Sequence, residues 1–156
     1  MARTPSGPTL WLALLRTTEA MGCVARQSMN DAGLGFSDFV LLEALLHLGP
    51  QTPSALGEKV GLTSGSITAA LDRLEARRLV ARRANPDDLR SRIVELADAG
   101  RALIEPAYAS HASDIEALFA RSLTAEQRRE LFDLLSALRK TALEETPRPP
   151  RGTPEQ

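Results

Sequence analysis

The stretch from residue 52 to residue 96 has the pattern of two short helices followed by two short strands, an order of elements that few folds contain. Thr52 and Pro53 are residue types preferred at a helix start, and the break at residues 61–63 separates this short helix from a second one at residues 64–77. The expected inward positions recur every three or four residues: Ala55, Leu56, Val60, Ile67, Leu71 and Leu74. Two helices joined this closely form the helix-turn-helix pattern.

A hairpin pattern follows the second of these helices. Residues 79–83 (LVARR) and 92–96 (RIVEL) fit two short strands, and the turn-forming sequence NPDD at residues 85–88 lies between them. Because successive strand residues point to opposite faces, only one of Arg82 and Arg83 is expected to face a partner on that side. The sequence therefore predicts a two-stranded wing beside the helix-turn-helix.

Helical periodicity extends on both sides of this central region. We expect a long helix over residues 9–32, a helix over residues 38–48 with Ser37 as its N-cap, and a helix over residues 98–120 containing Pro106. Thr124 and Gln127 have the spacing of a capping box and predict the start of a last helix. The apolar faces of the first helix and the last two exceed what one small core requires, and this surplus predicts a dimer interface.

Composition narrows the class of protein. The chain of 156 residues is 43% hydrophobic and 25% charged, with only 4% aromatic residues, which favours a mostly α-helical globular protein. A single cysteine, Cys23, excludes an intramolecular disulfide scaffold and a cysteine zinc cluster, and favours the cytoplasm. The apolar run at residues 10–15 is interrupted by Arg16 and is too short for a signal sequence or a membrane span. Net charge is -1, but residues 63–95 hold seven basic and five acidic side chains.

The ordered series of motifs between residues 57 and 104 resembles the MarR family of bacterial transcription regulators. The segments that carry the resemblance are GEKVGLTSGSIT (57–68), LDRLE (71–75), LVARR (79–83), NPDDLR (85–90) and LADAGR (96–101). Three positions depart from the family pattern: Arg78 replaces a frequent Gly, Leu89 a frequent Arg, and Ala97 a frequent Thr. The missing arginine at position 89 implies a weaker contact of the wing with DNA.

The resemblance implies where DNA would be contacted. The N-terminus of a helix attracts phosphate, and short hydroxyl side chains let the backbone approach it, so the start of the second helix is expected to enter the major groove. Arg90 would probe the minor groove from the wing, Asp88 would brace the wing by pairing with an arginine, and Arg92 would begin the return strand. The predicted DNA-binding residues are Ser64, Gly65, Ser66, Thr68, Ala69, Arg73, Arg83, Arg90 and Arg92. Helix capping by the hydroxyls and a solvated Arg73 are the alternatives.

The resemblance also implies a small, often aromatic effector bound between the dimerisation helices and the DNA-binding lobe. Trp11, Leu15 and His47 are the candidate lining residues, with ordinary packing as the alternative for each. No cofactor or metal is expected, because His47 and His111 lack a third convergent ligand. Cys23 is expected to be a buried structural residue, and thiol-based redox sensing through it is an alternative.

We therefore predict a mostly α protein: a winged helix-turn-helix with a two-stranded β-wing and N- and C-terminal dimerisation helices. The expected parts are a disordered tail (1–8), a dimerisation helix (9–36), the DNA-binding domain (37–96), C-terminal dimerisation helices (97–145) and a second disordered tail (146–156). The expected function is a cytoplasmic, nucleoid-associated homodimeric repressor that binds double-stranded DNA, responds to an effector and contacts no membrane. An enzyme is not expected, because no phosphate-binding glycine loop or paired nucleophile and base is present. A winged-helix protein-interaction module is the other alternative.

Overall fold

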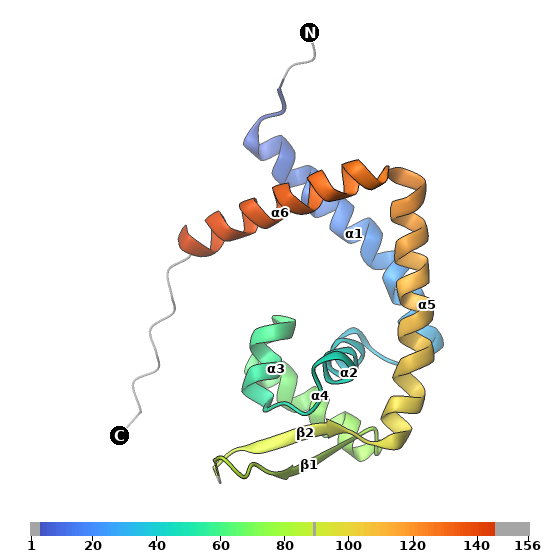
Figure 1. The fold of residues 1–156 in the computed structure, drawn as a ribbon, viewed down its shortest axis with the longest axis vertical. Helices are drawn as coiled ribbons and strands as arrows, with labels where there is room; N and C mark the ends of the chain where they lie inside the picture. Colours follow the sequence, from blue (N-terminus) through green and yellow to red (C-terminus); the bar gives the residue numbers. More distant parts are fainter. Residues whose placement is uncertain (1–3, 89, 146–156) are drawn as a thin grey trace. The chain divides into compact units, whose positions relative to one another are not determined.

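The computed structural model describes residues 4–88 and 90–145 and is mostly helical, with one antiparallel two-stranded sheet (Figure 1). The predicted fold class is confirmed. Within these residues no helix is both long and apolar enough to cross a membrane. The elements are, in chain order, α1 (Gly7–Asp31), α2 (Phe36–Leu48), α3 (Pro53–Val60), α4 (Ser64–Ala76), β1 (Val80–Ala84), β2 (Arg92–Leu96), α5 (Asp98–Ser122) and α6 (Ala125–Glu145).

The chain divides into two compact units, Met1–Ile115 and Glu116–Gln156, so the division falls inside α5. The boundary predicted between residues 96 and 97 instead marks the end of the wing. Helix α1 begins two residues before the expected Thr9, where the Ser6 hydroxyl accepts a hydrogen bond from the Thr9 N–H. Residues 1–3 of the predicted N-terminal tail and the whole predicted C-terminal tail, 146–156, lie outside the described residues.

The core of the first unit is built around α2. Phe39, Leu42 and Leu45 are fully buried or nearly so, and each such side chain stabilises the fold by about 1.5–3 kcal/mol. The side chains that complete this core include Leu56 of α3, Ile67, Leu71 and Leu74 of α4, Val94 of β2 and Ile104 of α5. Helices α3 and α4 and the wing therefore pack on one hydrophobic core around α2.

The wing is joined to the helical core by backbone hydrogen bonds as well as by side-chain packing. In the hairpin Val80 pairs with Leu96 and Ala84 with Arg92. Gln51, just before α3, exchanges two backbone hydrogen bonds with Val94, at N–O distances of 3.0 and 2.8 Å. The sequence pattern did not predict this extra bridge, because a single paired residue has no periodicity.

Two of the three predicted helix caps are confirmed. The Thr52 hydroxyl accepts the N–H of Ala55, and Thr124 and Gln127 exchange both bonds of the capping box, at 2.9 and 3.2 Å. The prediction for Ser37 is wrong, because α2 already begins at Phe36 and Gly35 is its N-cap, without a side-chain hydrogen bond.

Arg78 occupies a position that suits glycine. Its φ is 58°, and the bonds from Arg78 N to Glu75 O and from Leu79 N to Leu74 O form a Schellman motif at the end of α4. A side chain in this left-handed conformation costs about 1 kcal/mol. Arg78→Gly is expected to raise the free energy of unfolding, measured by urea titration, by up to about 1 kcal/mol. Ala76→Gly, inside the last turn of α4, is the control and should lower it; a lower value for Arg78→Gly would contradict this account of the turn.

Candidate nucleic-acid interface

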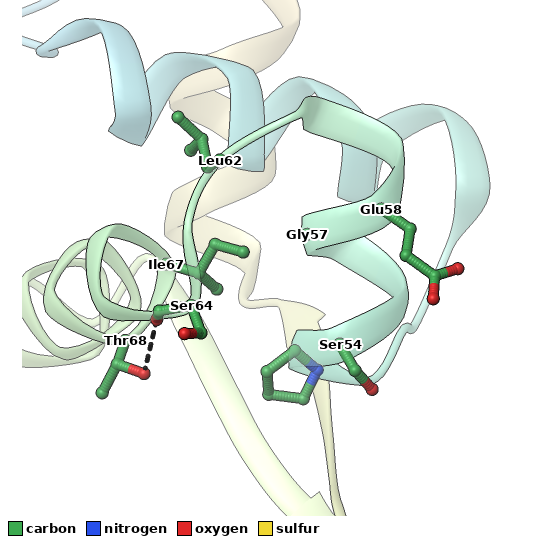
Figure 2. Close-up of a pocket in the computed structure, with 8 residues that line it drawn as sticks. Ser54, Gly57, Glu58, Leu62, Ser64, Ile67 and Thr68 are labelled. Carbon is green, nitrogen blue, oxygen red and sulfur yellow. Dashed lines mark hydrogen bonds between the residues drawn. The ribbon is translucent and has the colours of Figure 1, made fainter. Parts of the chain in front are cut away.

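A helix-turn-helix forms because α3 and α4 approach closely at a glycine. A Cβ on Gly57 would lie 2.6 Å from Cδ1 of Ile67, so the bare Gly57 lets α4 pack against α3. The left-handed Gly61, with φ of 68°, ends α3 and directs the chain into α4. A groove of about 330 Å³ lies between the two helices. Figure 2 shows residues that line it, with Ser54 of α3 on one side and Ser64 and Thr68 of α4 on the other.

The start of α4 is exposed, and the first N–H groups of a helix have no acceptor within the helix. Its N-cap is Thr63, whose hydroxyl accepts the Ser66 N–H at 3.3 Å, so the predicted capping alternative belongs to Thr63 and not to Ser64. The Thr68 hydroxyl donates to the Ser64 carbonyl within the helix (Figure 2). Ile67, Leu71 and Leu74 are buried, as predicted. The predicted contact residues on the other side are all exposed: Ser64, Gly65, Ser66, Thr68, Ala69 and Arg73.

Arg73 is exposed but already has a partner. One of its terminal nitrogens, Nη2, donates to Oδ1 of Asp38 at 2.7 Å. The hydrogen bond, and then the attraction of the Asp38 carboxylate, raise the pKa of Arg73 above its ordinary value. No sequence pattern indicates this pair, because 35 residues separate its members.

The two neighbouring arginines of β1 are paired as well. Arg82 is half-buried and forks between two carboxylates of α4, Asp72 at 2.7 Å and Glu75 at 2.9 Å. Arg83 lies exposed and donates through Nε to Glu95 of β2 at 3.0 Å. Arg82 therefore places one positive charge between two acidic groups on the helix that carries the predicted DNA contacts and offsets part of their charge.

Arg82→Gln is expected to weaken DNA binding by roughly tenfold, because Asp72 and Glu75 would then face the phosphates uncompensated. The measurement is fluorescence anisotropy with labelled DNA at fixed salt. The variant Arg82→Gln with Asp72→Asn and Glu75→Gln should recover the affinity. If this triple variant stays as weak as Arg82→Gln, Arg82 itself contacts DNA and the neutralising role is wrong.

Short polar side chains beside the turn of the wing form a hydrogen-bond network. Oδ1 of Asp88 accepts the backbone N–H of Arg90 at 3.0 Å, so Asp88 braces the tip through the backbone and not through the predicted arginine pair. Asn85 is 9% exposed and donates to the Ser91 hydroxyl at 2.8 Å. Sequence reasoning missed Asn85 and Ser91, because Asn and Ser are ordinary turn residues. Leu89 lies outside the described residues.

Arg90 and Arg92 differ from Arg73, Arg82 and Arg83 in their charge partners. Both are exposed, β2 begins at Arg92 as predicted, and in the described part of the chain neither has an ion-pair partner. Arg73, Arg82 and Arg83 are each paired with a carboxylate. Of the four arginines predicted to contact DNA, the two without an ion pair in the described residues, Arg90 and Arg92, therefore lie at the turn and return strand of the wing.

The three predicted effector-binding residues are not brought together in one groove. His47 lines a groove of about 310 Å³ between α2 and α3, where Glu43 and Lys59 also lie, and its ring packs edge-on against Tyr108 at 4.6 Å. Trp11 and Leu15 are exposed on α1 and are not among the residues that line this groove.

Cys23 and His111 also have defined surroundings. The expectation that Cys23 is buried is wrong: it is exposed, and Nη2 of Arg26 lies 3.2 Å from its sulfur. His111 packs against Phe39 and lies 3.2 Å from the Ser28 hydroxyl. Among the described residues, no three His, Cys, Asp or Glu side chains are grouped to hold a metal ion.

Comparison with known proteins identifies the family. A sequence model of the MarR family matches residues 37–91, which contain the helix-turn-helix, β1 and the turn that leads to β2. The Bacillus subtilis HTH-type transcriptional regulator MhqR is 31% identical over 111 residues, covering 71% of this chain and 77% of the relative. The chain belongs to the MarR family. It is a winged helix-turn-helix transcription regulator that binds DNA, and its relatives are regulators and not enzymes.

Solved structures agree with this fold. A mutant of Escherichia coli MarR in complex with operator DNA has a TM-score of 0.76 at 23% identity, covering 83% of this chain and 92% of that one. Bordetella bronchiseptica BpsR, whose DNA binding is regulated by 6-hydroxynicotinic acid, has a TM-score of 0.73 at 25% identity, covering 83% and 97%. The helix-turn-helix and the wing of this chain are therefore parts of a MarR-type fold.

Proposed function

We propose that this MarR-family regulator is a homodimeric repressor that acts in the cytoplasm on a pseudo-palindromic operator. The observation that carries the dimer is the large apolar surface left open on two helices. Trp11 is 63% exposed on α1, and Phe132 is 71% exposed on α6. The other large exposed apolar side chains of these helices are Leu10, Leu12, Leu15, Val24, Leu134, Leu135, Leu138 and Leu143. A row of large exposed apolar side chains on a helix, present on α1 and again on α6, is typical of an interface.

In the proposed complex each α4 enters a major groove and each wing reaches a flanking minor groove. Ser64, Gly65, Ser66, Thr68 and Ala69 would approach the DNA at the start of α4. Arg90 and Arg92 would supply wing cations, and Arg73 and Arg83 would border this surface. The two α4 helices of a dimer would bind half-sites about 34–36 Å apart, one turn of B-DNA.

We propose further that a small aromatic acid releases the operator. BpsR provides the precedent among proteins of similar structure. The groove beside His47 favours such a ligand, because Lys59 offers a cation for a carboxylate and His47 an aromatic face. Trp11 and Leu15 would contribute from α1 only in the dimer.

Leu138→Glu tests the dimer, because a charge placed in the interface opposes association. Leu138 is 54% exposed in the single chain, so the fold itself should tolerate the change. Sedimentation equilibrium should show a dimer for the unmodified protein and mainly monomer for the variant, with at least about a tenfold weaker association. The control Arg139→Glu places a glutamate at the next residue of α6, outside the apolar row, and should leave the association unchanged. A monomeric unmodified protein would refute the proposed dimer.

The operator geometry has its own test. Hydroxyl-radical footprinting on the intergenic DNA upstream of the gene should show two protected segments one helical turn apart. A single protected segment would contradict the two-fold arrangement.

Redox control through Cys23 is the second candidate, favoured by its exposure and by the Arg26 contact. Titration with hydrogen peroxide during the DNA-binding measurement tests it. Release of the operator that is abolished by Cys23→Ser would support redox sensing, and release that persists in that variant would exclude it.

A further inference from the structure

Two arginines of the α4 region reach the segment that joins α1 to α2. Arg73 and Arg77 lie four residues apart, so they occupy the same side of the helix on successive turns. Arg73 pairs with Asp38 in the first turn of α2 at 2.7 Å, and Nη1 of Arg77 donates to the Gly33 carbonyl at 3.2 Å. The segment 33–38, which we call the α1–α2 joint, therefore meets α4 at two points.

The two arginines have two acceptors in the joint, the Asp38 carboxylate and the Gly33 carbonyl, and Asp38 is the buried one of these residues. Its side chain is 8% exposed, whereas that of Arg73 is 55% exposed. A buried carboxylate needs a charged or hydrogen-bonding partner to offset its lost hydration. In the described residues Arg73 is the one side chain that supplies an ion pair to Asp38. The guanidinium of Arg73 is therefore committed to α2 even though it lies on the surface expected to face DNA.

The α1–α2 joint is itself well fixed to α1. The Gly33 N–H donates to the Asn30 carbonyl at 2.9 Å, and the Leu34 N–H donates to the Met29 carbonyl at 3.0 Å, which closes the C-terminus of α1. Leu34 is 2% exposed and belongs to the core. A displacement of the end of α1 would therefore move the acceptors of both arginines.

We infer that Arg73 is a positioning residue and does not itself contact DNA. Through Asp38 it sets the orientation of α4 and couples α4 to the end of α1. Arg77 contributes a second, weaker tie through a backbone acceptor. Arg82 holds the same helix to β1 through Asp72 and Glu75. This role rests on the proposed function, since it gives the proposed dimer helix α1 a route to the helix that enters the groove.

Asp38→Asn separates positioning from direct contact by the sign of its effect. If Arg73 contacts a phosphate, removing the Asp38 charge frees a cation beside the DNA, and binding becomes tighter or stays the same. If Arg73 works through Asp38, the same change loosens α4, and binding becomes weaker. We expect operator affinity to fall about tenfold in Asp38→Asn and in Arg73→Gln, and no further in the double variant, because the two residues act as one pair.

The salt series provides a second readout that a general loss of stability would not reproduce. The slope of log affinity against log salt falls by about one for each phosphate that a variant can no longer bind. Arg73→Gln is expected to leave this slope unchanged, whereas the control Arg90→Gln should reduce it. Urea titration confirms that each variant is folded at the assay temperature. Tighter binding by Asp38→Asn, or a reduced slope in Arg73→Gln, would overturn the inference.

The coupling between Arg73 and Asp38 can be measured without DNA. A negative result for this coupling can therefore be distinguished from a negative result for the proposed function. Amide hydrogen exchange of α4 should accelerate in Asp38→Asn and Arg73→Gln to a similar extent, and the double variant should add little. Unchanged exchange in both single variants would refute the tie even if the protein binds its operator. Faster exchange in a protein that binds no operator would keep the tie and refute the proposed repressor.

Discussion

Gly100→Ala is expected to lower the free energy of unfolding by about 4 kcal/mol or more, enough to unfold much of a marginally stable domain. The added Cβ would overlap the carbonyl oxygen of Leu79 and lie 2.8 Å from its carbonyl carbon. Both are backbone atoms, and the same oxygen accepts the Ala97 N–H at 3.1 Å, so the neighbour cannot simply rotate away. The first turn of α5 can pack against the backbone of Leu79, just before β1, because Gly100 has no side chain.

Gly65→Ala is the matched control for this prediction. Gly65 is also helical, but a Cβ there meets nothing within 4 Å, so stability should be kept or rise by up to about 1 kcal/mol. Urea titrations of both variants make the comparison. If Gly100→Ala unfolds at the same urea concentration as the unmodified protein, the close contact between α5 and Leu79 is wrong.

Arg90→Ala should weaken operator binding by roughly 100-fold, because a dimer loses one wing arginine from each chain and each contact is worth at least about a tenfold factor. Arg90 has the features required of a contact: it is exposed, without an ion pair among the described residues, and supported by the bond from its N–H to Asp88. The fold should be unaffected, since that bond uses the backbone.

The control for Arg90→Ala is Arg101→Ala, which removes a cation already paired with Glu105 on α5. Fluorescence anisotropy should show little change in its operator affinity, and sedimentation should show the same oligomeric state for both variants. Equal affinity of Arg90→Ala and the unmodified protein would remove the wing from the DNA-binding surface.

Most helices and the hairpin could be predicted from the sequence because their signals are local. The threonine caps at Thr52 and Thr124 and the buried face of α4 follow from spacing over one or two turns. The start of α2 was misplaced because Ser37 is a good cap by residue type, while the backbone at Gly35 already adopts the capping conformation without a side-chain bond.

The electrostatic organisation of the site could not be predicted in the same way. Arg73 and Asp38, or Arg82 and its two carboxylates, meet only after the chain has folded. Counting charges made residues 63–95 mildly basic but could not show which cations are already paired. The distinction between the paired Arg73, Arg82 and Arg83 and the unpaired Arg90 and Arg92, among the described residues, is a property of the fold.

Operator binding tests the central claim most directly. Fluorescence anisotropy would compare the unmodified protein on its own upstream intergenic DNA and on a scrambled sequence of equal length, over a salt series. The account predicts sequence-selective binding, at least about 1,000-fold tighter to the intergenic DNA near physiological salt. Equal and weak affinity for both DNAs, falling steeply with salt, would contradict a sequence-specific regulator of its own upstream region.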